Sequence, residues 1–146
     1  GQVMKRGVFI TIIVVCILFA TLFVNANSQE RIVENLICAR TDILSNYYAG
    51  LISKEETMTK ISDVTTDFLK EEDLTNLEKY FQCDLEQVVD YEILDINVDY
   101  WDDEVICAEV TIDWDAEGLK GRDNFSHTYS VICKKEENFY KLAQFF

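Results

Sequence analysis

The sequence contains one histidine, His127, and imidazole is the side chain best suited to act as a general acid or base near neutral pH. His127 alternates with Phe125 and Tyr129, which is the pattern of a strand with one apolar face. Pairing this strand with the preceding one so that their apolar faces agree puts His127 opposite Ile112, on the core side. No partner carboxylate is identifiable, and a single histidine near a strand end is more often a structural hydrogen-bonding residue. We therefore expect a structural role and keep catalysis as the alternative.

Carboxylates alternate just before a glycine in the segment Asp113-Trp114-Asp115-Ala116-Glu117-Gly118. Alternate acidic side chains before a glycine resemble the first half of a calcium-binding loop, in which they converge on one hard cation. The twelfth position holds Asn124 where such a loop needs a bidentate glutamate, and the flanking segments have the pattern of strands. We expect no metal site here. The alternative is a calcium site with Asp113, Asp115 and Glu117 as ligands.

Four cysteines follow the N-terminal apolar run: Cys38, Cys83, Cys107 and Cys133. The strand pairing above points Cys107 to the polar face and Cys133 to the core face, which disfavours a disulfide between them. A bridge from Cys38 to Cys83 stays open. The sequence contains no C-x-x-C pair, so neither a zinc site nor a thioredoxin-type site is expected, and nothing in the sequence indicates a cofactor.

An apolar run without a charge covers residues 7–24, and 18 residues at about 1.5 Å each span roughly 27 Å, close to the hydrocarbon thickness of a bilayer. Lys5 and Arg6 precede the run and favour a cytoplasmic N-terminus. The sequence therefore predicts a cytoplasmic tail (1–6), a membrane-spanning signal anchor (7–26) and an extracytoplasmic domain (27–146). The alternative is a cleaved signal peptide, with cleavage after Ala26 and secretion of the remainder.

The chain is strongly acidic, with a formal net charge of −14. All 27 acidic residues follow Ala26, whereas Lys5 and Arg6 precede it, so the domain carries 11 basic residues against 27 acidic ones, a net charge of −16. Such a surface repels phosphate backbones, and nucleic acid is excluded as a direct partner. An anionic lipid surface is repelled for the same reason, so the domain is expected to stand away from the membrane.

Three helices are expected before the chain changes to strands. Apolar residues three and four apart predict a long amphipathic helix over residues 29–52. Ser53 and Glu56 form a capping box that begins a second helix, whose apolar stripe runs from Met58 to Leu69, and a third short helix follows Asp73.

Alternating apolar residues then predict four strands, at 94–100, 106–114, 125–133 and 139–146, and they put Leu94, Ile96, Val98 and Tyr100 on one face of the first strand. Matching apolar faces of the second and third strands sets Ile106 opposite Cys133, Val110 opposite Tyr129 and Trp114 opposite Phe125, besides the pair already named. Tight turns are expected at 102–103 and 136–138, and a longer polar connection at 115–124. Three helices followed by a four-stranded antiparallel meander predict an α+β domain in which the helices cover the apolar face of the sheet.

The order of elements resembles the nuclear-transport-factor-two-like (cystatin-like) superfamily, in which a curved antiparallel sheet wraps a helical layer into a cone. The resemblance covers residues 29–146 and rests on Tyr47-Tyr48-Ala49-Gly50, the strands from Tyr91 to Trp114, and Asn138-Phe139-Tyr140-Lys141-Leu142. The short strand that this family inserts between its helices has no clear counterpart. Enzymes of the superfamily use an Asp, His or Tyr inside the cone, which implies a pocket lined by Tyr47, Tyr48, His127 and Tyr129.

Membrane-anchored members of the superfamily include inner-membrane subunits of type IV secretion and conjugation machines, which are similar in overall plan. The sequence as a whole therefore predicts a non-enzymatic, membrane-anchored interaction domain with a protein partner, as a component of an envelope or conjugative transfer assembly. The alternative is an exported small-molecule-binding protein or enzyme of the cone-like type.

Overall fold

The computed structural model describes residues 28–79 and 87–146. Three helices come first in the chain and four strands follow them. The elements are α2 (Ser28–Tyr48), α3 (Lys54–Val64), α4 (Asp67–Lys79), β1 (Gln87–Trp101), β2 (Val105–Gly118), β3 (Gly121–Glu136) and β4 (Phe139–Phe145).

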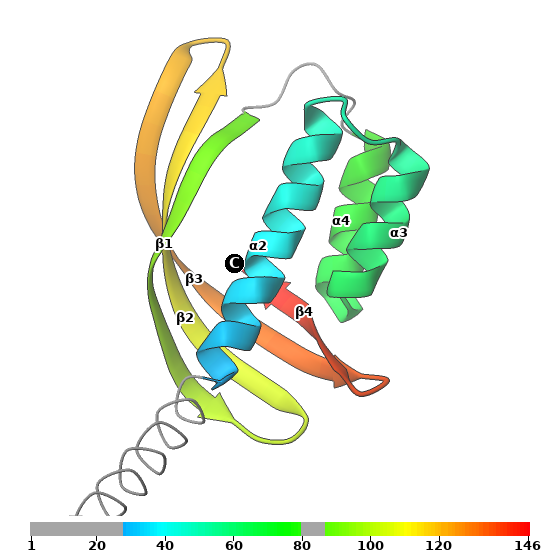
Figure 1. Cartoon of the computed structure of the whole chain (residues 1–146), viewed down its shortest axis with the longest axis vertical. Helices are drawn as coiled ribbons and strands as arrows, with labels where there is room; N and C mark the ends of the chain where they lie inside the picture. The colour runs from blue at the N-terminus through cyan, green and yellow to red at the C-terminus, as the bar shows by residue number, and fades with distance from the viewer. Residues whose placement is uncertain (1–27, 80–86) are drawn as a thin grey trace, which may run out of the picture.

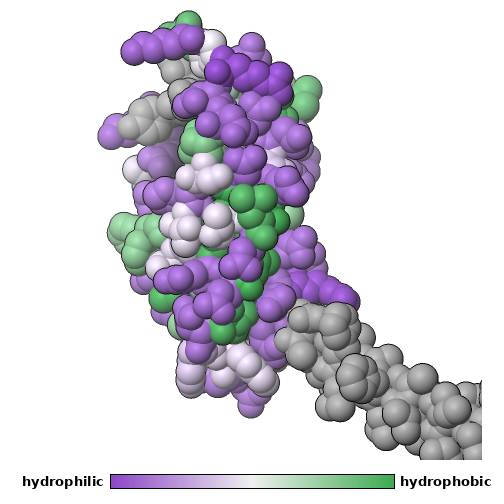
Figure 2. Space-filling view, turned by 90° about the vertical axis from the view of Figure 1, so that its left-hand side faces the viewer, coloured by the Kyte–Doolittle hydropathy of each residue, from purple (hydrophilic) through white to green (hydrophobic). Residues whose placement is uncertain are grey.

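The three helices pack on one face of a strongly curved sheet (Figure 1). The strands are antiparallel neighbours in the order β1-β2-β3-β4, so the predicted α+β architecture with a meander sheet is confirmed. The face of the sheet away from the helices, the outer face, is mostly hydrophilic, with a hydrophobic patch in its middle (Figure 2). None of the described helices is long and apolar enough to cross a membrane, and the predicted anchor (7–26) and tail (1–6) lie outside the described residues.

The core lies between the inner face of the sheet and the helices. Side chains of β2 alternate between buried and partly exposed positions along the whole strand, as the sequence pattern predicted. Helix α2 contributes Val33 and Ile37 to the same core, and α4 contributes Leu69. The fully or nearly fully buried apolar residues of the sheet are Ile106, Ala108, Val110, Ile112, Trp114, Ala116, Val131, Cys133, Leu142 and Ala143.

The predicted pairing of β2 with β3 is confirmed residue by residue. Ile106 pairs with Cys133, Val110 with Tyr129, Ile112 with His127, and Trp114 with Phe125. The predicted polar connection at 115–124 was wrong, because both strands continue to a turn of two residues, Leu119 and Lys120, closed by the pair Gly118 and Gly121. Gly121 adopts a φ of 105°, a conformation that glycine adopts without strain.

In β1, the prediction that Leu94, Ile96, Val98 and Tyr100 share one face was wrong. The pairing with β2 shifts at three places, two of which are between Ile93 and Asp95 and between Val98 and Tyr100. Each shift inserts an extra residue and reverses the alternation beyond it. As a result Leu94 and Tyr100 are more than half exposed, whereas Ile93, Ile96 and Val98 pack against the core.

The capping box at the start of α3 is confirmed, because the Ser53 side chain accepts a hydrogen bond from the Glu56 N–H at 3.1 Å. The predicted continuation of this helix from Met58 to Leu69 was wrong. The chain leaves the helix at Thr65, which is extended (φ −125°, ψ 156°), and α4 starts at Asp67. Thr65 forms a bridge with Leu142, and the Thr66 N–H bonds the Leu142 carbonyl at 2.8 Å. Leu142 of β4 thus accepts the hydrogen bond that the Thr66 N–H would make to its own helix if the helix continued.

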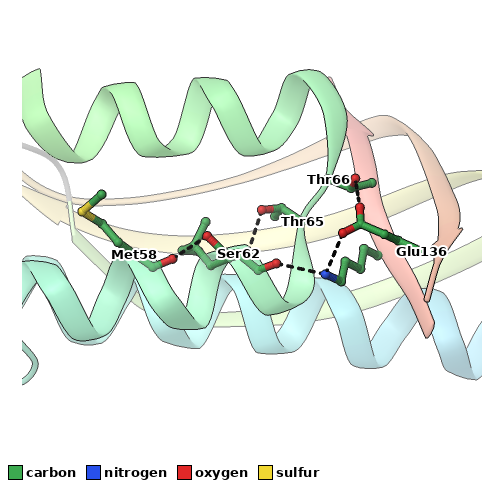
Figure 3. A network of polar contacts seen from close by, with 7 residues as sticks. Met58, Ser62, Thr65, Thr66 and Glu136 are labelled. Atoms are coloured by element: carbon green, nitrogen blue, oxygen red, sulfur yellow. Dashed lines mark hydrogen bonds and ion pairs between the residues drawn. The ribbon is translucent and has the colours of Figure 1, made fainter. Parts of the chain in front are cut away.

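A polar network holds this break against the β3–β4 hairpin (Figure 3). Glu136 accepts hydrogen bonds from the Thr66 hydroxyl and, at 3.2 Å, from Lys141 Nζ. Lys141 Nζ also donates to the Ser62 carbonyl at the end of α3, at 3.2 Å. The Thr66 and Lys141 bonds hold the pKa of the Glu136 carboxyl below its ordinary value, because they stabilise its charged form.

The sign of this pKa shift gives a prediction for Glu136→Gln. A carboxyl with a lowered pKa in the folded state contributes stability above its unfolded pKa of about 4.5, and this stability disappears as pH falls through the folded pKa. The variant should therefore melt below wild type at pH 7, and the gap should narrow below pH 4.5. Thermal denaturation followed by circular dichroism measures both. Glu71→Gln, at an exposed position of α4, is the control, and an equal narrowing there would contradict the assignment to Glu136.

Candidate interaction site

Four aromatic side chains form a row across the inner face of the sheet, one from each strand. The rings of Tyr91 and Trp114 lie 5.7 Å apart, those of Trp114 and Tyr129 meet edge to face at 6.2 Å, and Tyr129 stacks on Phe145 at 4.3 Å. The Trp114 indole N–H donates to the Tyr129 hydroxyl at 2.9 Å. Burial raises the pKa of Tyr129, and the hydrogen bond from Trp114 opposes that shift. These ring contacts link all four strands, in addition to the backbone hydrogen bonds between neighbouring strands.

Helix α2 holds the β1 end of this row by hydrogen bonds from Tyr91. The Tyr91 hydroxyl donates to Asp42 Oδ1 at 3.1 Å and reaches the Cys38 carbonyl at 3.5 Å. Burial and these neighbours raise the pKa of Tyr91, because a phenolate there would lose water and face negative charge. Tyr91 therefore stays a hydrogen-bond donor to α2 at any ordinary pH.

The β4 end of the row is held by an ion pair between α2 and α4. Arg40 Nε and Nη2 donate to the two carboxylate oxygens of Asp73, each at 2.7 Å, and the Asp73 side chain is only 4% exposed. The Arg40 guanidinium also lies over the Phe145 ring, 5.3 Å from its centroid. This bidentate pair fixes the position of α4 relative to Phe145.

A groove lies between α4 and the end of β4, and we call it the α4–β4 groove. Its volume is about 400 Å³. Phe68 and Phe146 at its rim are 67% and 72% exposed, and the two rings flank the same hollow. The residues that line it are Phe68, Leu69, Glu72, Gln144, Phe145 and Phe146. An apolar floor with one carboxylate suits an apolar side chain of a partner, with a basic or hydrogen-bonding group beside it.

His127 lies where the pairing predicted, on the inner side of β3, with its ring 4.6 Å from that of Tyr129. Its side chain is exposed. The buried carboxylate described above, Asp73, is already paired with Arg40. His127 thus lacks the enclosed surroundings that a general acid or base would need, and the α4–β4 groove does not include it.

The four residues proposed for one cone-like pocket do not come together. Tyr47 is 1% exposed, and its hydroxyl donates to the Leu77 carbonyl at 3.3 Å, so it packs between α2 and α4. Its neighbour Tyr48 meets it edge to face at 5.2 Å, and the Tyr48 carbonyl accepts a hydrogen bond from Gln87. The rings of Tyr129 and His127 form a second, separate contact on the sheet, at 4.6 Å. Tyr47 is thus used for packing between helices.

The three residues of the calcium-loop alternative, Asp113, Asp115 and Glu117, lie within β2. These residues do not lie on a loop but alternate on the outer face of β2, where Asp113 and Asp115 share a shallow depression with Asp90 and Glu92 of β1. Asp115 forms a bidentate pair with Arg122, which lowers the pKa of Asp115, and Asp113 accepts a hydrogen bond from Ser126 at 3.1 Å. Within residues 28–79 and 87–146, no three His, Cys, Asp or Glu side chains are grouped so as to hold a metal ion.

The cysteines that the structure describes, Cys38, Cys107 and Cys133, form no disulfide with one another. Cys133 is buried among apolar residues, and this burial raises the pKa of its thiol to about 12. Cys107 lies next to the Ile106–Cys133 pair but points to the other face, as predicted. The Cys38–Cys83 bridge stays a prediction, because Cys83 lies outside the described residues.

Sequence patterns missed the residues of the α4–β4 groove. Phe68 was assigned to the buried stripe of a single helix that ran through Val64, and the break at Thr65 and Thr66 turned it outward instead. Only the two adjacent threonines gave a signal, because β-branched residues that can bond the backbone are poor helix formers. The ion pair of Arg40 with Asp73 had no signal in the sequence, because the two residues are 33 positions apart.

No protein-family model matches the chain, and no curated protein matches it. Among solved structures, the intermembrane space region of the chloroplast protein ARC6 is similar, with a TM-score of 0.50 and 11% sequence identity. The similarity covers 80% of this chain and 93% of that chain. At this identity it shows a shared fold alone.

Proposed function

We propose that this chain is a membrane-anchored extracytoplasmic domain that binds a protein partner within an envelope assembly. The observation that carries the proposal is the α4–β4 groove, where Phe68 and Phe146 expose most of their surface beside an apolar floor. Large aromatic rings grouped at a rim, and backed by a hollow, are typical of protein interaction sites. The buried Arg40–Asp73 pair keeps the floor of this groove rigid before a partner arrives, which lowers the entropy cost of binding.

The proposed location rests on residues 7–26 as the anchor and on Lys5 and Arg6 as the cytoplasmic flank. The protein of similar fold is an intermembrane space region of a chloroplast protein, and we propose a comparable setting, next to a membrane, for this domain. The competing location is secretion after cleavage behind Ala26. N-terminal sequencing of the mature chain tests it, since a first residue of Asn27 would replace the anchored form with a secreted one.

Two finer points belong to the same proposal. Membership of the nuclear-transport-factor-two-like superfamily stays a prediction, and so does the link to conjugative transfer machines that rests on it. The alternative of a cone-like enzyme or small-molecule binder would need an enclosed pocket around His127, and the exposure of this side chain gives that alternative no support.

Site-specific photo-crosslinking tests the proposed function. A photoreactive amino acid replaces Phe146 in the full chain, which is expressed in the membranes of its own cells and irradiated. We expect one discrete adduct with a protein that mass spectrometry can identify. The matched control carries the same amino acid at Leu51. This residue is 73% exposed, lies just beyond the C-terminal end of α2 and does not line the α4–β4 groove. No adduct at position 146, or the same adducts at both positions, would contradict the proposal.

A further inference from the structure

Strand β4 pairs with only part of β3, on the side of β3 that faces away from β2. Its pairing runs from Glu136 to Val131, and the last contact is the reciprocal pair of hydrogen bonds between Ser130 and Phe146, at 2.7 and 3.2 Å. Beyond Ser130, β3 continues to Gly121 while paired with β2 on its other side without a register shift. In the described part of the chain, no strand pairs with β3 on this side over Arg122–Thr128. We call this stretch the β3 edge.

The backbone groups of the β3 edge are placed to accept another strand. In an antiparallel ladder, alternate residues direct their N–H and C=O groups to the same side. Because Ser130 bonds Phe146, the groups of Thr128, Ser126, Asn124 and Arg122 point to that side as well. All residues from Gly121 to Thr128 are exposed, and seven extended residues offer about 23 Å of ladder.

The other edges of the sheet are protected, and the β3 edge is not. Three register shifts distort β1, which also carries Asp90, Glu92, Asp95 and Asp99. The edge of β4 is occupied by the bridge from Thr65 to Leu142 and by the Thr66 N–H. By contrast, residues 124–128 of the β3 edge contain no charge and no proline, and Arg122 at its far end is paired with Asp115. Soluble proteins normally blunt free edges with bulges, charges or cover, so a regular edge without a bulge, uncharged over residues 124–128, is a surface for pairing.

The two faces beside this edge differ in chemistry. On the inner face, Phe125, His127 and Tyr129 line the edge, and Phe125 is 41% exposed. On the outer face, a shallow depression reaches from Asn124 across β2 to β1. It is lined by the carboxylates of Asp90, Glu92, Asp113 and Asp115, of which Asp115 is paired with Arg122. An added strand would lie about 10 Å from the β2 backbone, within reach of an extended basic side chain.

Resting on the proposed function and naming its partner's chemistry, we propose that the β3 edge binds an extended segment of another protein, alternating apolar with basic residues, as a strand in line with β4. The apolar residues contact Phe125, Tyr129 and the rim ring Phe146, and the basic residues face the outer carboxylates. This is β-strand addition, in which main-chain hydrogen bonds give affinity and alternate side chains give specificity. A second copy of this chain is disfavoured as the partner. Pairing of two β3 edges would put two acidic depressions on the same face, and each chain carries a net charge of −14, so the two copies would repel each other.

The test uses the full chain in a non-ionic detergent and a fluorescent nine-residue peptide that alternates valine with lysine. The key variant is Ser126→Pro, which removes one outward N–H, and the matched control is Ser126→Ala, which removes the hydroxyl contact with Asp113 but keeps that N–H. We expect fluorescence anisotropy to show at least a tenfold weaker Kd for the proline variant and less than a twofold change for alanine. Equal Kd values for both variants would overturn strand addition, because an unspecific attraction of lysine to acid would survive either change.

A second measurement avoids any folding defect of the proline variant. On wild-type protein, peptides with N-methyl groups on one set of alternating amides should fail to bind, and peptides with the other set methylated should bind as well as the parent. Amide exchange should slow at Thr128, Ser126 and Asn124 on binding. Equal binding of both methylated sets, equal binding of a valine–glutamate peptide, or a dimer of this chain that Ser126→Pro abolishes would each overturn the proposal.

The outcome also separates this proposal from the proposed function. If the photoreactive residue at position 146 still gives its discrete adduct in cells while the alternating peptides fail, the interaction site stands and strand addition is wrong. If that adduct is absent, the proposed function itself is wrong.

Discussion

Replacing Arg40 with methionine should lower the free energy of unfolding by about 3 kcal/mol, because it leaves the Asp73 carboxylate buried without its partner. Asp73 is 4% exposed, and both of its oxygens are bonded to Arg40 at 2.7 Å. The variant also loses the guanidinium that covers Phe145. Urea denaturation of the full chain in a non-ionic detergent, followed by tryptophan fluorescence, measures the change.

The double variant Arg40→Met/Asp73→Leu separates the ion pair from the packing of its side chains. Removing both charges avoids an unpaired buried carboxylate, so the double variant should be more stable than Arg40→Met alone. Arg31→Met, at an exposed position on the same helix, should change stability by less than about 0.5 kcal/mol. If the effects of Arg40→Met and of Asp73→Leu, each measured alone, simply add in the double variant, the pair is not coupled and this account of how α4 is positioned is wrong.

Replacing Trp114 with alanine should destabilise the domain by about 3–5 kcal/mol, the range for removing a large aromatic side chain from a core. Trp114 is 7% exposed, contacts the Tyr91 and Tyr129 rings, and donates to the Tyr129 hydroxyl. The loss therefore combines a cavity with the removal of the centre of the aromatic row. Circular dichroism in increasing urea measures it without relying on the tryptophan.

Trp101→Ala is the matched control, since the same side chain is removed from the same sheet. Trp101 lies at the end of β1 and is 56% exposed, so its removal should cost less than about 1 kcal/mol. Equal losses from the two variants would mean that burial does not set the effect and that the row does not organise the inner face.

Local patterns in the sequence predicted most elements correctly, for a physical reason. The Ser53 cap and the alternation of β2 and β3 depend on residues close in the chain, so their types alone select the conformation. The β2–β3 register followed from matching two apolar faces, because a slip by one residue would turn every core side chain to solvent.

Within the site, the sequence anticipated that Tyr129 and His127 share the inner face, but it grouped them wrongly with Tyr47 and Tyr48. Tyr47 looked equally suited to a pocket, because an apolar ring with a hydroxyl fits both a ligand site and a helix interface. The Leu77 carbonyl that accepts its hydrogen bond lies 30 residues away, and only the packing of α2 on α4 brings the two together.

One histidine and a run of alternating acids were the features of this chain that most suggested chemistry, and the sequence by itself determined only their strand and their face. The tertiary structure decided what surrounds them: His127 lies exposed beside Tyr129, and Asp115 is held by Arg122. It also decided where β4 ends on β3, which leaves the β3 edge open. The reason is that composition and alternation fix how a segment folds locally, whereas exposure, ion pairing and edge cover depend on contacts between segments far apart in the chain.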